Sequence, residues 1–548
     1  MQPNAISEDI MHARYIAVAL CTALLLPLCS LAQSTNVNVS NLVSFDGEPS
    51  LAVNPANPDN IIAGWMRLRL DGKIWIAVRS SFDGGVTWSP IQFLPHMQPD
   101  YGSADVSIAF HRSGLAYLLY IDYRMAPDTV GGVYLTHSTD GGLRWSEPRE
   151  AVSTIGRPDL PLDRPWLAVD NSGGATDGTV YMSVMSAYWY TGAHHIYTRS
   201  SADSGATWSP LNRLDNDEYS PGLVTKSYGA ISLGGDGRIY TAYMSYDTLA
   251  SPFLRLYTAV SSDAGATWER AVISNVALWP NNFGYAQGYS IAADPIHPGH
   301  AAVAWIDERN GDSDVLLKRT TDGGRSWGSA VRINDDPIAN GVVQDLVWAS
   351  FSPTGQLGIA WRDRRIAVPG VSAPFDIYGR VSPDGGGSFE PNQRLSSASS
   401  PWMTLGCCNS FLGLALTGES LLAVWSDYRS DDWDIYFHSS STAVALDGDP
   451  PALPSELAIV ENYPNPFYNN TIITYNLPTA GTVTLKIYDM LGRHHATLVD
   501  DWRNAGRHQA VFTAQDSPPG TVYYCVLSAG ALVTSKSILL LGARHTPK

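Results

Sequence analysis

One short phrase, repeated six times, constrains the fold of this chain more than any other feature. Its pattern is Ser or Thr, any residue, Asp, any residue, Gly, any residue, Thr or Ser, and Trp, with Arg144 at the second hydroxyl position in one copy and Phe389 replacing Trp in another. The aspartates stand 57 to 63 residues apart, at Asp83, Asp140, Asp203, Asp263, Asp322 and Asp384. A regular period of this length, with four short strands in each unit, predicts an all-β propeller.

Each residue of the phrase has a physical role in a tight turn. The aspartate accepts hydrogen bonds from backbone N–H groups a few residues further on, and the glycine takes a φ that other residues avoid. The aromatic residue packs under a neighbouring strand. On these residues the phrase is identified as an Asp-box, and the chain resembles the sialidase-like (BNR-repeat) propeller family. In that family the box is structural and holds the turn between the third and fourth strands of a blade.

A second phrase, Trp-x-Asp-x-Arg, helps to count the blades. It occurs at Trp305–Arg309, Trp361–Arg365 and Trp425–Arg429, with a weaker relative at Tyr120–Arg124. The copy at 425 follows the last Asp-box, so it indicates a unit without a box. Seven first strands are expected, at Pro49–Val53, Val106–Phe110, Trp166–Val169, Gly229–Leu233, Tyr289–Ala293, Leu346–Phe351 and Phe411–Leu416. We therefore predict seven blades; six, the number in sialidases of this family, is the alternative.

The N-terminal segment is expected to close the ring. The last unit has three strands, and Thr35–Phe45 alternates apolar and polar residues as a fourth strand would. Pairing it with the last blade would leave no open sheet edge.

Residues 1–32 have the features of a secretory signal peptide. Arg14 precedes an apolar stretch from Tyr15 to Leu28, and Ser30-Leu31-Ala32 forms a small-x-small cleavage site. We expect cleavage near Ala32, a secreted or outer-membrane surface-attached product, and no transmembrane span in the mature chain.

Charge and cysteine usage exclude several classes of protein. The formal net charge is −17 at pH 7, which argues against nucleic acid as a partner. Of the five cysteines, Cys407, Cys408 and Cys525 lie beyond the signal and make no disulfide framework. We expect no cofactor and assign no metal site, because His194-His195 and the acidic stretch 307–314 are more typical of solvated loops.

Residues 442–456 have the composition of a linker, and residues 457–548 are expected to form a small immunoglobulin-like sandwich. The phrases Asn462–Phe467, Val483–Asp489, Pro519–Tyr524 and Ser535–Leu540 occur in this order at the C-terminus. They resemble the type A sorting domain of type IX secretion. That resemblance implies the type IX machinery as a partner and either surface attachment or release. A carbohydrate-binding sandwich is the alternative.

Four arginines each follow an aspartate by two residues, at Arg124, Arg309, Arg365 and Arg429. If they project toward the channel mouth, their guanidiniums would clamp an anionic sugar, as an arginine cluster does in sialidase-like enzymes. A pair repeated in four blades is also what a blade-building device would produce, with the arginine bridging neighbours. Both interpretations stay open.

Function is expected where the repeat breaks. The third unit begins Asp163-Arg164-Pro165-Trp166, and Arg164 joins the candidate substrate-binding residues. Its loop at 186–195 carries Tyr188 and Trp189, which would form either a sugar-stacking platform or a packed lid. Candidate catalytic residues at the same end of the channel are Glu48, Asp105, Asp163, Tyr228 and Tyr289.

Three functions are compatible with these residues. The first is a sialidase-like propeller acting on glycans, as an exo-hydrolase of an anionic sugar, with Asp105 or Asp163 as general acid. The family resemblance adds Tyr228 or Tyr289, beside Glu48, as a tyrosine nucleophile. The Arg-Ile-Pro phrase of true sialidases is absent. The second is a glycan-binding or adhesion propeller without catalysis, and the third is a polysaccharide lyase using His194 or His195.

Overall fold

The computed structural model describes most of the chain between residues 36 and 541. The described ranges are 36–41, 45–124, 130–155, 162–186, 195–215, 223–224, 231–246, 254–277, 288–366, 374–401, 412–430, 432–442, 456–463, 465–467, 470–503, 506–514, 518 and 520–541. Every regular element in these ranges is a strand, which confirms the expected all-β class. Within them no helix is long and apolar enough to cross a membrane.

The described residues between 36 and 442 form seven antiparallel sheets, in which neighbouring strands mostly follow chain order. The first three sheets are β2 (Asp46–Asn54), β3 (Asn57–Leu68), β4 (Ile74–Ser81), β5 (Gln92–Phe93); β6 (Gly102–Phe110), β7 (Ala116–Arg124), β8 (Val130–Ser138), β9 (Arg149–Ser153); and β10 (Leu162–Val169), β11 (Val180–Ser186), β12 (Ile196–Ser201), β13 (Asn212–Arg213).

The remaining sheets repeat this plan. They are β14 (Leu223–Val224), β15 (Ile231–Leu233), β16 (Ile239–Tyr246), β17 (Leu254–Ser261), β18 (Glu269–Val276); β19 (Tyr289–Ala293), β20 (Ala301–Asp307), β21 (Asp314–Thr320), β22 (Val331–Arg332); β23 (Gln344–Phe351), β24 (Leu357–Asp363), β25 (Asp376–Ser382), β26 (Gln393–Arg394); and β27 (Leu412–Leu416), β28 (Ser420–Asp427), β29 (Asp434–Ser441), β1 (Val37–Asn38).

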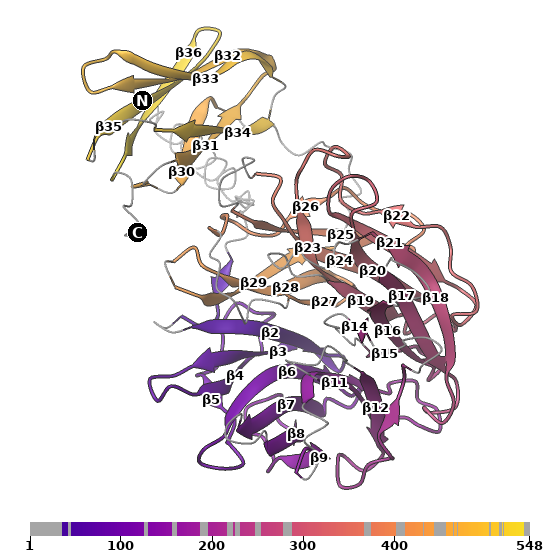
Figure 1. Cartoon of the computed structure of the whole chain (residues 1–548). Helices are drawn as coiled ribbons and strands as arrows, with labels where there is room; N and C mark the ends of the chain where they lie inside the picture. The colour runs from indigo at the N-terminus through magenta and orange to yellow at the C-terminus, as the bar shows by residue number, and fades with distance from the viewer. Residues whose placement is uncertain are drawn as a thin grey trace, which may run out of the picture.

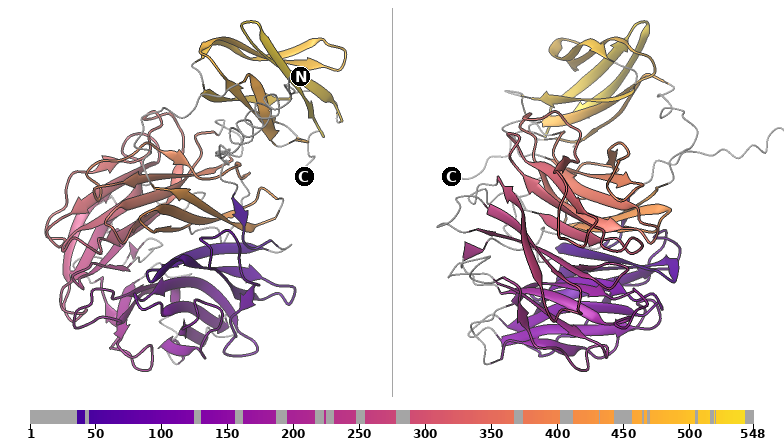
Figure 2. Two further views of the ribbon diagram at one scale, coloured as in Figure 1. Left: turned by 180° about the vertical axis from the view of Figure 1, so that it is seen from behind. Right: turned by 90° about the vertical axis from the view of Figure 1, so that its right-hand side faces the viewer.

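The first strands of the sheets contact one another in a closed circle. β2 contacts β6, and the contacts continue through β10, β15, β19, β23 and β27 back to β2. Figure 1 shows the sheets following one another from indigo to orange around a common centre, and Figure 2 shows the same arrangement from behind and from the side. Sheets arranged radially around a channel define the propeller architecture.

The N-terminal strand closes this circle. β1 pairs with β29, with Val37 opposite Phe437 and Asn38 opposite Tyr436. The backbone N–H of Val39 donates to Ile435 O over 2.8 Å, and the Ser40 hydroxyl donates to Asp434 over 2.9 Å. The expectation that the segment 35–45 supplies the fourth strand of the last sheet is therefore confirmed.

Each Asp-box turn joins its own strands and packs on a neighbouring sheet. In the first box, Asp83 accepts the backbone N–H of Thr87 over 2.8 Å and the Thr87 hydroxyl; these bonds lower its pKa to about 2. A Cβ on Gly85, which has a φ of 93°, would lie 2.1 Å from the ring of Phe437. The Trp88 ring packs edge-on against Phe437 at 5.3 Å. Box and closing sheet are therefore one packed unit.

The C-terminal residues form two further sheets. One contains β30 (Ala458–Tyr463), β31 (Asn470–Leu477) and β34 (Gly506–Thr513); the other contains β33 (His494–Arg503), β32 (Gly481–Asp489), β35 (Val522–Ala529) and β36 (Leu532–Leu539). Alternate residues of β32 and β35 point into a shared apolar core. Cys525 lies in this core, and burial raises the pKa of its thiol to about 12.

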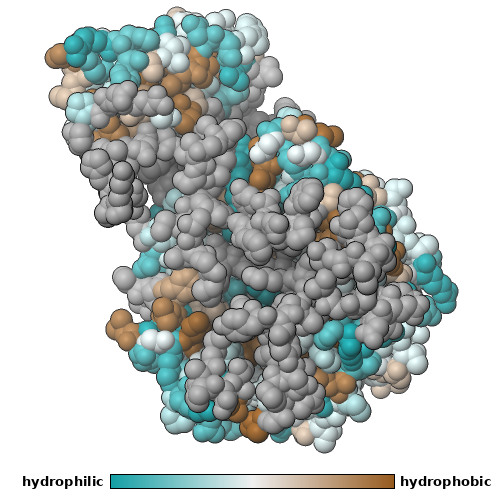
Figure 3. Space-filling view, in the orientation of Figure 1, coloured by the Kyte–Doolittle hydropathy of each residue, from teal (hydrophilic) through white to brown (hydrophobic). Residues whose placement is uncertain are grey.

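On the face shown in Figure 3, the coloured residues mix polar side chains (teal) and apolar side chains (brown). In the C-terminal sheets the most exposed large apolar residues are Met490, Leu491, Trp502 and Val533.

Closure by the N-terminal strand gives a first prediction. Val39 is fully buried between the first and last sheets, so the Val39→Ala variant should lower the free energy of unfolding by about 1–3 kcal/mol. Denaturant unfolding would measure this. Val86→Ala, at a position 74% exposed, is the control and should change stability by less than about 0.5 kcal/mol. Equal effects of the two variants would contradict a closing role for this segment.

Candidate functional site

Four of the first strands share the same backbone irregularity. Their pairing register with the second strand shifts at Gly47/Ser50, Ala104/Val106, Asp163/Trp166 and Asp345/Trp348. At each shift a residue other than glycine has a positive φ: Glu48 at 52°, Asp105 at 44°, Arg164 at 52° and Leu346 at 52°. Bulges and left-handed residues carry a cost and gather at functional sites. The four shifts mark one level of the channel.

This level lies near the channel end opposite the Asp-boxes. The shifts occur toward the beginning of each first strand, whereas an Asp-box follows the third strand of its sheet. In an antiparallel sheet the first and third strands run in the same direction, so the start of the first and the end of the third lie at opposite ends of the strands. We call the end that carries the shifts the channel mouth.

Three carboxyl groups meet at the mouth. Asp105 forms side-chain hydrogen bonds with Glu48 and with Asp163, so the groups make a chain across the first three sheets. The backbone N–H of Arg164 donates to Asp105 over 2.9 Å, and its guanidinium Nε lies 3.9 Å from Asp163. The sequence singled out all four residues as candidates, and the structure brings them together.

The carboxyl chain holds protons near neutral pH. Burial, with the negative charge of Glu48, raises the pKa of Asp105 to about 7. Burial, with the charge of Asp105, raises the pKa of Asp163 to about 8, against the opposing charge of Arg164. Because the two groups are hydrogen-bonded, they titrate as a pair. A carboxyl group that keeps its proton at pH 7 has the state that a general acid requires.

Exposure distinguishes the three carboxyl groups. The side chain of Asp163 is 23% exposed, whereas Asp105 and Glu48 are buried. A ligand in the mouth therefore reaches Asp163 first, with Asp105 behind it.

A pair of tryptophans lies below the carboxyl groups. Trp166 and Trp348 each stand two residues after the left-handed residue of their strand, and their rings lie 4.8 Å apart at 47°. On the Asp-box side of them is a cavity of about 300 Å³ lined by residues from all seven first strands, Leu51, Ile108 and Phe351 among them. The tryptophan pair therefore separates the carboxyl groups at the mouth from the rest of the channel.

In the first two sheets a serine stands where these tryptophans stand, two residues after the left-handed residue of the strand. There, Ser50 accepts the backbone N–H of Ile108 over 3.2 Å, and Ser107 accepts that of Leu167 over 3.0 Å. Ser232 and Ser290 likewise accept the N–H groups of Ala293 and Ala349 in the next sheet, over 3.0 and 3.1 Å.

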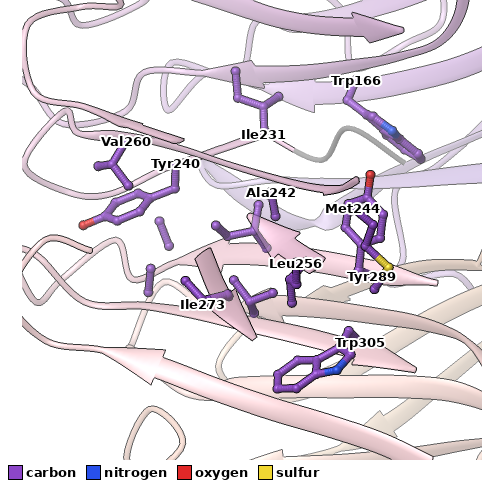
Figure 4. Packing of buried hydrophobic residues seen from close by; sticks show 14 of the residues in the cluster. Trp166, Ile231, Tyr240, Ala242, Met244, Leu256, Val260, Ile273, Tyr289 and Trp305 are labelled. Carbon is purple, nitrogen blue, oxygen red and sulfur yellow. The ribbon is translucent and has the colours of Figure 1, made fainter. Parts of the chain in front are cut away.

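Tyr289 lies in the apolar core rather than at the carboxyl groups. It is 2% exposed and packs in the cluster that contains Trp166 and Trp305, as Figure 4 shows. Four other predicted residues, Tyr188, Trp189, Tyr228 and His194, lie outside the described residues, as do Cys407 and Cys408. The ring of His195 is described, and its Nδ1 lies 2.7 Å from Asp215.

The arginines of the Trp-x-Asp-x-Arg phrase are held by their own aspartates. The Trp305, Trp361 and Trp425 indoles donate to Asp307, Asp363 and Asp427 over 2.8–2.9 Å. Arg309, Arg365 and Arg429 pair with the same carboxylates. Each buried aspartate therefore binds an indole and a guanidinium together.

These arginines also bridge to the preceding sheet. Arg309 donates to Ser274 and to Asn275 O, Arg365 pairs with Asp335, and Arg429 donates to Ser397. Arg124 pairs with Asp100 at the surface. This geometry favours the blade-building interpretation of the phrase over a clamp for substrate.

A second charged cluster at the mouth was not predicted from the sequence. Asp345, next to the left-handed Leu346, accepts Arg362 Nε over 2.6 Å and Arg364 over 3.2 Å, and all three charged residues are buried. Burial opposes ionisation of Asp345, but Arg362 and Arg364 outweigh it and lower its pKa. The only signal was the double arginine phrase 361–365. The mouth thus has a carboxyl-rich side and an arginine-rich side.

A protein-family model described as "BNR repeat-like domain" matches residues 125–401, about half of the chain. The chain belongs to this family.

Several solved structures resemble the chain at low identity. One is the Hadza microbial sialidase Hz136, 17% identical, with 68% of this chain and 74% of that chain covered and a TM-score of 0.42. Another is a protein of unknown function from Dyadobacter fermentans, 14% identical, with 74% of this chain and 98% of that chain covered and a TM-score of 0.39. A third is the α-L-arabinanase of Penicillium chrysogenum, 15% identical, with 60% of this chain and 93% of that chain covered and a TM-score of 0.38. At this level of similarity none of them defines the activity of this chain.

The bridging arginines give a prediction about stability. The Arg365→Ala variant leaves the buried carboxylate of Asp363 without its guanidinium, so it should lower the free energy of unfolding by about 3 kcal/mol. Arg124→Ala breaks an exposed pair and should cost less than about 1 kcal/mol. Denaturant unfolding of both variants checks the difference. A stable Arg365→Ala variant would contradict the structural role.

The buried carboxyl chain gives a prediction about pH. Because folding raises the pKa of Asp105 from 3.8 to about 7, the folded chain binds this proton more tightly than the unfolded chain. Its contribution therefore lowers stability as the pH rises from about 4 to about 7. Asp105→Asn removes this dependence, so its melting temperature should fall less between pH 5 and pH 8. Asp83→Asn, in an Asp-box, is the control. Equal declines in wild type and Asp105→Asn would contradict the raised pKa.

Proposed function

We propose that the chain is a secreted, sialidase-like, seven-bladed propeller that acts on glycans as an exo-glycoside hydrolase. The observation that carries the proposal is the hydrogen-bonded chain Glu48–Asp105–Asp163 at the mouth, in which two carboxyl groups have pKa values near or above 7. Glycoside hydrolysis needs one carboxyl group that is protonated and a second that is ionised.

In this proposal Asp163 is the general acid, because it is the most exposed of the three groups. It donates its proton to the glycosidic oxygen, and the hydrogen bond from Asp105 keeps it oriented. Glu48 lies at the other end of the chain. Two hydrogen bonds and one carboxyl group separate Glu48 from Asp163, which corresponds to roughly 5–7 Å. Retaining glycosidases place their two carboxyl groups about 5–5.5 Å apart, so Glu48 is the second group.

The arginines of the mouth suggest the substrate class. Arg164 lies beside Asp163, and Arg362 and Arg364 both pair with Asp345. Guanidinium groups at the mouth favour a sugar that carries a carboxylate or sulfate. Tyr228 stays a candidate nucleophile through the family resemblance alone.

One observation favours the alternative of glycan binding without catalysis. Asp105 is hydrogen-bonded to both Glu48 and Asp163 and so lies between them, whereas a glycosidase needs the space between its two carboxyl groups for the reacting bond or the attacking water. The lyase hypothesis requires His194 or His195 as the base. Of these two, His195 is described, and its Nδ1 lies 2.7 Å from Asp215, so that this nitrogen already has a partner within the protein.

We also propose that residues 1–32 direct secretion and that residues 457–548 are a type IX sorting domain with an immunoglobulin-like fold. The support is the order of the C-terminal phrases, together with two sheets that share one core. The linker is placed at 442–456.

A release assay tests the hydrolase. The purified chain is incubated with sialylated glycoprotein, arabinan oligosaccharides and uronate polysaccharides, while free sugar and unsaturated products are measured. Asp163→Asn should reduce release at least about 100-fold, and wild-type activity should fall above pH 8 as Asp163 loses its proton. The control, Asp83→Asn, makes the same chemical change at the opposite end of the sheets and should keep full activity.

Three outcomes would overturn this function. Full release by Asp163→Asn would exclude the assigned acid, and unsaturated product would indicate a lyase. Binding of a glycan to wild type without any release would establish the binding propeller instead.

A further inference from the structure

We propose that Asp294, His297 and His300 form a binding site for Zn²⁺ or a similar divalent transition-metal ion. The three residues lie on the turn between β19 and β20. Their ligand atoms, one carboxylate oxygen and two imidazole nitrogens, all lie within 4.8 Å of one another. This site is independent of the carboxyl groups at the channel mouth.

The donor set and spacing suit zinc. Zn²⁺ takes imidazole nitrogen and carboxylate oxygen at about 2.0–2.2 Å, so two ligands of a tetrahedral ion lie roughly 3.3–3.5 Å apart. Asp294 Oδ2 and His297 Nδ1 are hydrogen-bonded at 2.8 Å, and the ligand atoms of all three residues lie within 4.8 Å of one another. An ion would bind in place of this hydrogen bond. Three protein ligands leave a fourth position for water.

The turn holds the carboxylate in place before any ion binds. Asp294 Oδ1 accepts the backbone N–H groups of Ile296 and His297 over 2.8 and 3.1 Å, which leaves Oδ2 directed at the imidazole. The Asp294 side chain is 1% exposed, whereas that of His297 is 56% exposed. One ligand is therefore fixed and another is accessible to an ion from solvent.

The backbone of the turn brings the second imidazole to the same place. The N–H of Asp294 donates to His300 O over 3.0 Å, and the N–H of His300 donates to His297 O over 3.1 Å. The rings of His297 and His300 consequently lie 5.3 Å apart.

A neighbouring sheet leaves space for the site. A Cβ on Gly355 would lie 3.2 Å from His297 Cε1 and 3.6 Å from Asp294 Oδ1. Glycine at this position, in the turn between β23 and β24, therefore keeps the imidazole uncrowded.

The position of the site indicates what the ion would do. The residue between Asp294 and Ile296 is Pro295, which lines the channel cavity, and the turn lies at the Asp-box end of the ring. An ion here would fix the turn of the fifth sheet at the rim of the cavity, far along the channel from Asp163. We infer a stabilising metal, and loss of the ion should leave glycan chemistry at the mouth intact.

The corresponding turn of the second sheet provides a matched control. His111 lies in that turn, and its Nε2 pairs at 3.4 Å with Asp177 in the turn between β10 and β11 of the next sheet; no second histidine stands in the turn at 111–115. This is a histidine–aspartate contact at the same end of the ring, formed between two sheets and without the second imidazole.

The test measures zinc binding by the purified full chain, carrying no affinity tag and stripped with a chelator. Competition between the protein and a chromophoric chelator for ZnCl₂ gives the affinity and the number of ions bound. His297→Ala and His300→Ala should each weaken zinc binding at least about tenfold, and the double variant should bind one ion fewer than wild type. His111→Ala should bind as wild type does.

Thermal unfolding provides a second readout. Zinc should raise the melting temperature of wild type and of His111→Ala, but not that of the double variant, because an ion stabilises only a chain that binds it. Melting of all variants in chelator shows whether the substitutions themselves disturb the fold. Equal zinc stoichiometry and affinity in wild type and the double variant would overturn the proposal, as would a wild-type chain that binds no zinc at micromolar concentration.

Discussion

The ring depends on how the inner edges of its first strands are satisfied. Each first strand has a second strand on one side only, so its other edge carries backbone groups that need partners. Serine hydroxyls from one sheet accept N–H groups of the next, as Ser50 does from Ile108 and Ser290 from Ala349. Where Trp166 and Trp348 take the place of serine, contact between their rings joins two sheets that are not neighbours in the chain. The register shifts at the mouth directly precede these regular contacts between the first strands.

Aspartate has opposite electrostatic properties at the two ends of the sheets. In the Asp-boxes, hydroxyl and N–H donors surround an exposed carboxylate, and the pKa of Asp83 falls to about 2. At the mouth, burial and the negative charge of Glu48 raise the pKa of Asp105 to about 7. The first environment stabilises the fold because its hydrogen bonds favour the ionised carboxylate. The second makes folding less favourable at neutral pH, which is a common property of sites built for chemistry.

The sequence predicted the ring because each unit carries its own turn signals. Asp83, Gly85 and Trp88 satisfy one another locally, and the alternation around Val37 and Val39 was enough to place the closing strand. Asp163 and Arg164 were selected because they interrupt the repeat, and Glu48 and Asp105 because they fall at the same end of the channel. Their hydrogen bonding, and the meeting of Trp166 with Trp348, depend on backbone shifts that no local pattern encodes. The roles of Arg365 and His297 likewise follow from contacts between sheets or across a turn.

The pairing of β1 with β29 has a consequence for the order of events during synthesis. The last sheet needs strands from both ends of the ring-forming segment, since Val37 pairs with Phe437. The ribosome must therefore complete β29 before the ring can close. Until then the first six sheets cannot form a closed ring. Contacts between such distant residues form slowly, because the intervening chain loses entropy before they are made. The seven sheets can therefore close into a ring only after almost the whole ring-forming segment has been synthesised.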